Sequence, residues 1–278
     1  MRGNIAVREN LMYTKEQIKA QLSSLGAPKG VPVIVHTALR LVGEVEGGGE
    51  GLLDALIEYF TEDGGLLCIP THTWANLGKD KITLDLVCPE SNLGALPNIA
   101  ARDSRGIRSE NPSHSMVVFG DRKRAESFIA NEPYVKTPTA PDSCYGKVYY
   151  EGGAVLLLGV AQNKNTYLHT VDEILNIPNR MATEPCRVSV RRRDGSVYER
   201  DLLLFFADFT DDISLRFTKF DTAFKYRGCV REGFVGDAPT QICDAVGMLE
   251  CVKLIYERAA GVDPLESEKP IPPAWYVR

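Results

Sequence analysis

The stretch that decides the fold is Ala154-Val-Leu-Leu-Leu-Gly-Val160, which runs into Asn165-Thr-Tyr-Leu-His169. Its first part shows no alternation of apolar and polar residues, and this favours a strand buried on both faces. A short polar loop and the start of a helix follow, so His169 is expected in the first helical turn at the carboxyl edge of a sheet. Proteins of the α/β class tend to place their sites at that edge. The stretch therefore predicts a central sheet covered by helices, with His169 at a site on its edge.

Patterns elsewhere in the chain extend this sheet. A β-branched strand over 31–36, an apolar helix over 52–60 and a second strand over 66–70 form a β-α-β unit. Asp194-Gly195 is a strong hairpin signal and makes the sheet mixed. Further helices are predicted over 14–25, after a capping box at Thr14, and over 240–260. We expect a single α/β domain over 1–278, with a central mixed β-sheet covered by helices.

Composition narrows the classes of partner. The chain has 278 residues and a net charge of −5, with no basic stripe, so nucleic acid is not expected. The longest apolar run is far below the roughly 20 residues that span a bilayer, and the first residues lack the pattern of a secretory leader. The seven cysteines form no CxxC pair and fit reduced, buried thiols. We expect a cytoplasmic protein without membrane partners.

The helix that begins near residue 166 carries the main catalytic candidate. His169 and Glu173 are four residues apart and can share one helix face, where a carboxylate raises the basicity of an imidazole, as a general base requires. Asp172 lies roughly 100° away on that helix. The alternative is that His169 only packs or caps, while Thr170 and Glu173 form a capping box. Spacing alone leaves both interpretations open.

Other motifs are weaker. His36, His72 and His114 also lie where strands meet loops, but their spacing does not preset a metal site, so no metal is expected. The glycine-rich turn over 47–51 precedes a helix and is either a phosphate cradle or a flexible turn. No potential general base stands at a spacing from Cys144 that would indicate a nucleophile–base pair, so a covalent nucleophile is not expected.

Eight segments together resemble the aminoglycoside 3-N-acetyltransferase family. They are Val33-Ile-Val-His36-Thr-Ala-Leu39, Gly43-Glu-Val-Glu-Gly-Gly48, Gly65-Leu-Leu-Cys-Ile-Pro-Thr71, Asn92-Leu-Gly-Ala-Leu-Pro97, Arg108-Ser-Glu-Asn-Pro-Ser-His-Ser115, Ser143-Cys-Tyr-Gly-Lys147, Val155-Leu-Leu-Leu-Gly-Val160, and Asn165-Thr-Tyr-Leu-His169 with Glu173. The resemblance covers most of the chain and implies an antibiotic N-acetyltransferase-like fold.

The resemblance also implies a reaction: in a ternary complex, an amine of an aminoglycoside attacks acetyl-CoA directly. His169 is then the base, Glu173 orients it or holds the acceptor ammonium, and Thr37 is the expected oxyanion donor. The residues expected to contact CoA are His36, Thr37, Ala38, Leu39, Val45, Gly47, Gly48, Arg108, Ser109 and Ser115. The residues expected to contact a polycationic acceptor are Trp74, Asp85, Asp172 and Glu173.

Three departures from the family pattern are visible. Ala38 stands where the family has a second hydroxyl, Asn111 stands where it has histidine, and the segment 72–92 is shorter than the family's acceptor loop. Asp211-Asp212 offers charge complementary to a cation, or is a pair of solvated surface acids. Alternatives are the same fold acting on another amine or acyl group, or a CoA-binding module without turnover. The protein is expected to be a monomer or homodimer.

Overall fold

The computed structural model describes residues 12–79, 81–205 and 212–277. The first residues, on which the expectation of no leader rests, and Asp211 lie outside the described residues. The strands are β1 (Pro32–Thr37), β2 (Leu66–Pro70), β3 (Leu84–Asp85), β4 (Ile107–Arg108), β5 (Met116–Phe119), β6 (Ala154–Leu158), β7 (Cys186–Arg191), β8 (Val197–Leu202), β9 (Val230–Val235) and β10 (Ala238–Asp244). The helices are α1 (Lys15–Ser24), α2 (Gly48–Phe60), α3 (Ala95–Arg102), α4 (Arg122–Ile129), α5 (Cys144–Tyr150), α6 (Tyr167–Ile174), α7 (Asp221–Tyr226) and α8 (Ala245–Arg258).

The central sheet is mixed, as predicted, but the Asp194-Gly195 hairpin from which this was predicted belongs to a separate sheet. Its order is β4-β5-β2-β1-β6-β10-β9. The three middle strands β2, β1 and β6 are parallel, so their carboxyl ends meet at one edge. The strands outside them run antiparallel to their neighbours. Position 37 of β1 pairs with position 158 of β6, which places the loop after β6 directly beside the end of β1.

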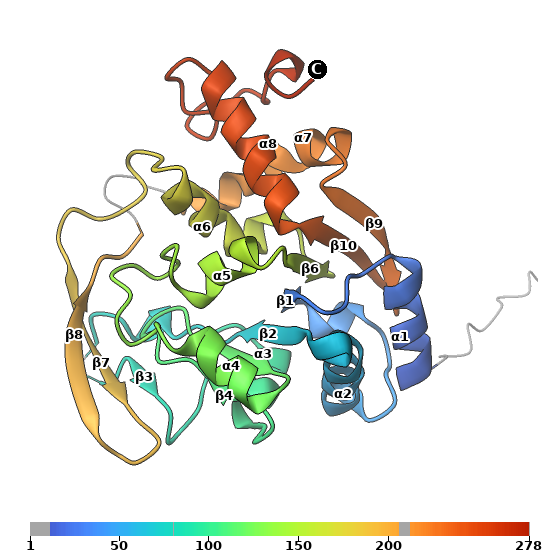
Figure 1. Cartoon of the computed structure of the whole chain (residues 1–278), viewed down its shortest axis with the longest axis vertical. Helices are drawn as coiled ribbons and strands as arrows, with labels where there is room; N and C mark the ends of the chain where they lie inside the picture. Colours follow the sequence, from blue (N-terminus) through green and yellow to red (C-terminus); the bar gives the residue numbers. More distant parts are fainter. Residues whose placement is uncertain (1–11, 80, 206–211, 278) are drawn as a thin grey trace, which may run out of the picture.

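Both faces of the middle strands are buried, which explains their continuous apolar runs. Because successive side chains of a strand point to opposite faces, Val155 and Leu157 enter one core cluster while Leu156 and Leu158 enter the other. The helices α1, α2 and α3 cover one face, and α5, α6, α7 and α8 cover the other (Figure 1). The predicted burial of residues 154–158 on both faces is confirmed.

A smaller sheet of order β3-β7-β8 lies beyond the end of the central sheet, at the left of Figure 1. Strands β7 and β8 form the predicted hairpin around Asp194 and Gly195, and Gly195 has φ 85°. A residue with a Cβ atom rarely adopts that backbone conformation, so glycine suits this turn.

The prediction of one helix over 240–260 is wrong in its first part. Residues 238–244 form β10, and helix α8 begins only at Ala245, where the Asp244 side chain caps it by accepting a hydrogen bond from the backbone N–H of Val246. In a strand that pairs on both sides, β-branched and cysteine side chains pack well, and tertiary pairing overrides the helical spacing. The capping box at Thr14 is confirmed.

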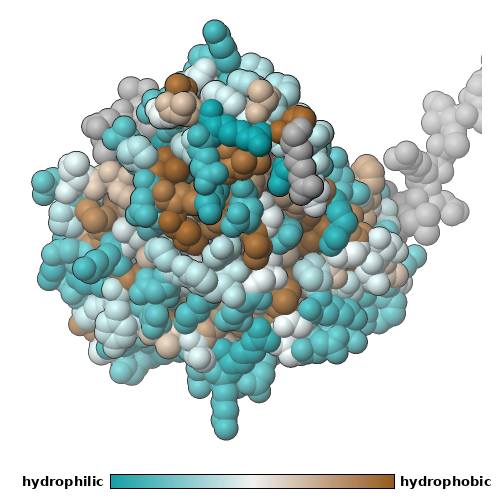
Figure 2. Space-filling model, turned by 45° about the horizontal axis from the view of Figure 1, so that its top comes forward, coloured by the Kyte–Doolittle hydropathy of each residue, from teal (hydrophilic) through white to brown (hydrophobic). Residues whose placement is uncertain are grey.

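Among the described residues, no helix combines the length and the apolar character that a membrane span requires. The face seen in Figure 2 is largely hydrophilic, with apolar side chains gathered in its upper part.

Candidate active site

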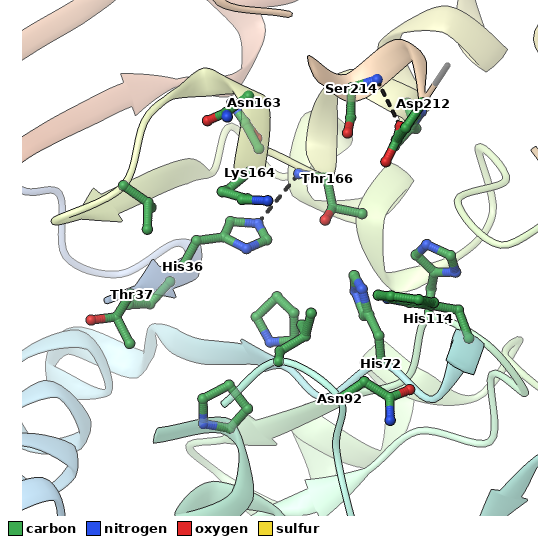
Figure 3. A pocket seen from close by; sticks show the side chains of 18 residues that line it. His36, Thr37, His72, Asn92, His114, Asn163, Lys164, Thr166, Asp212 and Ser214 are labelled. Atoms are coloured by element: carbon green, nitrogen blue, oxygen red, sulfur yellow. Dashed lines mark hydrogen bonds between the residues drawn. The ribbon is translucent and has the colours of Figure 1, made fainter. Parts of the chain in front are cut away.

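A cavity of about 390 Å³ opens where the carboxyl ends of β1 and β2 meet the loop after β6. Strand β1 contributes His36 and Thr37 to its wall, and the loop and first turn of α6 contribute Lys164, Thr166 and His169. Other lining residues are Val35, Pro70, His72, Trp74, Asn92, Leu93, Pro97, His114, Val160, Asn163, Asn165, Asp212 and Ser214. Figure 3 shows these side chains arranged around an open centre. The cavity lies at the sheet edge where the sequence predicts a site.

His169 lies on the wall of this cavity and is 7% exposed. Its ring stacks on Phe205, with centroids 4.1 Å apart, and meets the edge of Phe217 at 5.0 Å. Burial lowers the pKa of His169 to about 3, with a further contribution from the positive charge of Arg180. The imidazole is therefore neutral across the physiological range and is able to accept a proton.

The expected pairing of His169 with Glu173 is not found. Both carboxylate oxygens of Glu173 accept hydrogen bonds from threonine hydroxyls, those of Thr137 and Thr139, the latter at 2.6 Å. Glu173 also does not belong to the cavity wall. The loop over 137–139 takes up the carboxylate, and no carboxylate raises the pKa of His169. The expected pairing of Glu173 with His169 is therefore corrected, while contact of Glu173 with an acceptor stays a prediction.

Asp172 also has a role different from the expected one. It is buried and pairs with Arg180 at 3.0 Å, and Arg180 pairs with Asp263 at 2.7 Å. The Tyr256 hydroxyl accepts from Arg180 and donates to Asp263. This network ties α6 to α8 behind the cavity, so Asp172 holds the helix that carries His169 and does not face an acceptor.

All four histidines of the chain line the cavity. His36 Nε2 accepts from the backbone N–H of Thr166 at 3.4 Å, and this contact links β1 to α6 (Figure 3). His72 and His114 lie together, with ring centroids 4.3 Å apart, and His72 Nε2 is 2.7 Å from the Tyr145 hydroxyl. Burial lowers the pKa of each of these rings. The site thus presents neutral imidazoles.

No set of three or more His, Cys, Asp or Glu residues in the described ranges is arranged to hold a metal ion. The absence of a metal remains an expectation from the sequence.

Thr37 presents an unused hydroxyl. Its Oγ1 atom is buried and has no hydrogen-bond partner among the described residues, and the residue lines the cavity at the end of β1. A buried hydroxyl without a partner is costly unless a ligand completes its bonding. The Thr37 hydroxyl is therefore unused among the described residues.

Three of the expected CoA contacts line a second cavity, of about 340 Å³, beside the first. Leu39, Val45 and Gly48 are on its wall. Gly47, at φ 74°, is the N-cap of α2, and no side chain of the described residues caps this helix, although the N–H of Gly48 donates to the Val45 carbonyl at 2.8 Å. Ala38 lies between the residues that line the two cavities and uses its backbone N–H to bond Leu158. The chain thus runs from Thr37 on the wall of the first cavity to Leu39 on the wall of the second.

The remaining expected CoA contacts are internal. Ser109 and Ser115 are fully buried and do not reach the cavity. Arg108 donates to the carbonyl oxygens of Thr71 and Glu90 and to the Ser115 hydroxyl. These three residues hold the loop around 71–115 because the buried carbonyls need donors. Their contact with CoA stays a prediction from the resemblance.

The carboxylate of Asp85 pairs with Arg191 of the hairpin and caps backbone N–H groups of its own loop, and its contact with an acceptor stays a prediction. Asn111, the departure from the family's histidine, is buried, donates to Pro138 O and accepts from His114 N. It positions the loop that carries His114.

Trp74 lines the cavity as expected and is 48% exposed. Phe205 was not identified as a site residue from the sequence. For Asp212 the sequence left two alternatives, a partner for a cation or a solvated surface acid. Asp212 lies on the cavity wall and accepts from the backbone N–H of Ser214 at 2.9 Å (Figure 3). Neither residue stands next to a motif, and only the return of the chain after β8 brings them to His169.

The family comparison agrees with this geometry. The model of a family described as aminoglycoside 3-N-acetyltransferase matches residues 34–257. The chain belongs to this family. The predicted resemblance is thereby confirmed.

Relatives within the family have low sequence identity to this chain, but the similarity extends over most of both chains. Aminoglycoside N(3)-acetyltransferase IV from Salmonella sp is 28% identical over 233 residues, which cover 81% of this chain and 80% of the relative. Aminoglycoside N(3)-acetyltransferase III from Serratia marcescens is 28% identical, over 84% of this chain and 93% of the relative.

Solved structures confirm the predicted fold class. The apoenzyme of aminoglycoside acetyltransferase AAC(3)-IVa is 25% identical and superposes with a TM-score of 0.74 over 95% of this chain and 94% of that one. A single-residue variant of AAC(3)-IVa, solved in complex with a gentamicin, gives a TM-score of 0.75 at 25% identity, over 93% of this chain and 95% of that one. AAC-IIIb, in a binary complex with CoASH, shares the fold at 24% identity with a TM-score of 0.76, over 91% and 99%.

Proposed function

We propose that this protein transfers an acetyl group from acetyl-CoA to an amino group of an aminoglycoside, with His169 as general base. The observation that carries the proposal is the neutral His169 imidazole on the wall of a cavity that also presents the unused hydroxyl of Thr37. Membership of the aminoglycoside 3-N-acetyltransferase family supports the reaction and its position on the acceptor.

The chemistry needs a base and an oxyanion donor on opposite sides of the reacting carbon. The acceptor nitrogen attacks the thioester carbonyl, and the proton it loses passes to the free ring nitrogen of His169. The oxygen that becomes negative then accepts a hydrogen bond from Thr37 Oγ1. Collapse of this intermediate breaks the carbon–sulfur bond and releases the CoA thiolate. No residue of the protein is acylated in this route.

The two ends of the cavity suit the two substrates. Lys164 and His36 lie near the end of β1, beside the path to the start of α2, where the anionic groups of CoA find N–H donors. Asp212 lies at the other side, near His114, and offers its carboxylate to an ammonium group. The gentamicin complex of a relative supports a polycationic acceptor.

The test is the release of thiol from acetyl-CoA, followed with a chromogenic disulfide in the presence and absence of a panel of aminoglycosides and simple polyamines. We expect release only when an aminoglycoside is present. His169→Ala and the bulkier His169→Gln are expected to lower kcat about 10²–10⁴-fold while the affinity for CoA, measured by calorimetry, stays within about twofold.

Each other outcome assigns a different function. Full activity of both His169 variants would overturn the assignment of the base. Release with simple amines or with longer acyl-CoA, and none with aminoglycosides, would replace the acceptor or the acyl group. CoA binding without release under any condition would make the protein a binding module.

A further inference from the structure

A separate cavity of about 430 Å³ lies under the β7–β8 turn, between β4 and the end of α4. Apolar side chains of Ile107, Ile129 and Pro133 form part of its wall. Arg108 and Arg193 form another part. We name it the Arg108–Arg193 cavity. It shares no lining residue with the candidate active site.

Arg108 lines this cavity and carries an unsatisfied donor. The residue is 3% exposed, and its Nε and Nη2 atoms are bonded to Ser115 Oγ and to two backbone carbonyls. Its Nη1 atom is buried and has no partner among the described residues. A buried guanidinium N–H without an acceptor costs free energy that a bound acceptor would recover. The remaining bonds hold the guanidinium in place, so this donor is already oriented.

The charge at the cavity is also unbalanced. Burial lowers the pKa of Arg108 to about 10, with a further contribution from the positive charge of Arg193. The acidic residues on the wall have other partners: Glu110 pairs at 3.0 Å with Arg192, which also lines the cavity, and Asp194 accepts from the N–H and hydroxyl of Ser196. Three guanidinium groups thus line the cavity, and neither acid on its wall pairs with Arg108 or Arg193.

We propose that the Arg108–Arg193 cavity binds an organic monoanion, with a carboxylate head between the two arginines and an apolar body along Ile107, Ile129 and Pro133. A planar carboxylate matches the donor geometry of guanidinium groups. The carboxylates of Glu110 and Asp194 on the same wall repel ions of higher charge, such as a polyphosphate. The volume is that of an ordinary small-molecule site.

The test uses hexanoate as the probe, neutral hexanamide as its uncharged match, and inorganic phosphate as an anion without an apolar body. The melting temperature of the full chain is followed during each titration at constant ionic strength. We expect a saturable rise with hexanoate and none with hexanamide or phosphate, because a ligand that binds the folded state stabilises it.

Arg193→Gln removes one arginine from an exposed position, so the variant is expected to fold, and it should weaken hexanoate binding about tenfold, as the loss of a charged hydrogen bond does. Arg122→Gln, on the exposed side of α4, is the matched control and should bind as the unchanged protein does. His169→Ala should also bind hexanoate normally, so failure of the proposed acetyl transfer leaves this result intact.

Equal binding by the Arg193→Gln protein, or no saturable effect of hexanoate, would overturn the proposal. A rise with phosphate that depends on Arg193, without one for hexanoate, would also overturn it and replace the organic anion by an inorganic one.

Discussion

The imidazole of His169 lies almost parallel to the ring of Phe205, at an interplanar angle of 16° and a centroid distance of 4.1 Å. The edge of Phe217 closes a second side. This shell keeps water from the ring, and desolvation is the main reason for the low pKa of His169. Aromatic packing thus keeps the base of the proposed reaction neutral, and no carboxylate of the described residues opposes this by raising its pKa.

The first prediction concerns this packing. Phe205→Ala should admit water to His169 and raise its pKa from about 3 toward the ordinary 6.5. Because only the neutral ring accepts a proton, the acid limb of the kcat/KM profile should move to higher pH. Phe205→Leu, which keeps the site apolar, should move it less. A profile that is unchanged in the alanine variant would show that Phe205 does not control the ionisation of His169.

The second prediction concerns the unused hydroxyl of Thr37. Thr37→Val keeps the shape and removes the hydroxyl, so kcat should fall about 10²–10³-fold, the usual effect of losing one oxyanion donor. The melting temperature should not fall, because the hydroxyl has no partner among the described residues. Thr37→Ser should restore most of the rate. A valine variant with unchanged kcat would exclude Thr37 as the donor.

The third prediction concerns Asp212 at the acceptor side of the cavity. Asp212→Asn should raise KM for a polycationic acceptor about tenfold, since a hydrogen bond between charged groups contributes about 1.5–3 kcal/mol. The value of kcat should change little, and the difference in KM should shrink as salt is added. Glu250→Gln, an exposed change of the same net charge on α8, is the control. Equal KM values for the two variants would remove Asp212 from acceptor binding.

The fourth prediction concerns the buried network behind α6. Arg180→Met should leave Asp172 and Asp263 without their cation, and the free energy of unfolding in urea should fall by about 3–5 kcal/mol. Adding Asp172→Asn should recover part of this loss, because one uncompensated charge is removed. A loss below about 1 kcal/mol in the single variant would mean that the network does not hold α6 in place.

The sheet was predictable from the sequence because apolar runs report burial directly. The run over 154–158 has no polar position, and a strand covered on both sides fits it. The prediction of one helix over 240–260 was wrong because the apolar residues at its start fit the period of a strand as well as that of a helix. Only the cap at Asp244 marks where the helix begins.

The site was predictable to the extent that local order determines it. His169 follows from a strand, a loop and a helix start, and Thr37 from the end of a neighbouring strand. Glu173 is bonded by Thr137 and Thr139, which lie in a loop that precedes β6 in the chain. Phe205, which stacks on His169, follows the β7–β8 hairpin. Such contacts depend on how distant segments pack, and no spacing within α6 encodes them.

The last prediction concerns acid stability. The folded-state pKa values of His36, His114 and His169 are lowered to about 3, below the ordinary 6.5. Below pH 6.5 the unfolded chain therefore binds protons that the folded chain cannot, and stability falls as the pH falls.

Each such histidine should cost about 1 kcal/mol of unfolding free energy between about pH 7.5 and 5.5. His114→Gln should lose that much less than the unchanged protein over the same interval, measured by urea unfolding at both pH values. Buried carboxyls such as Glu132 and Glu173, whose pKa burial raises, act in the opposite direction but are present in both proteins, so the comparison cancels them. An equal loss in the two proteins would show that His114 titrates in the folded state as it does in the unfolded chain.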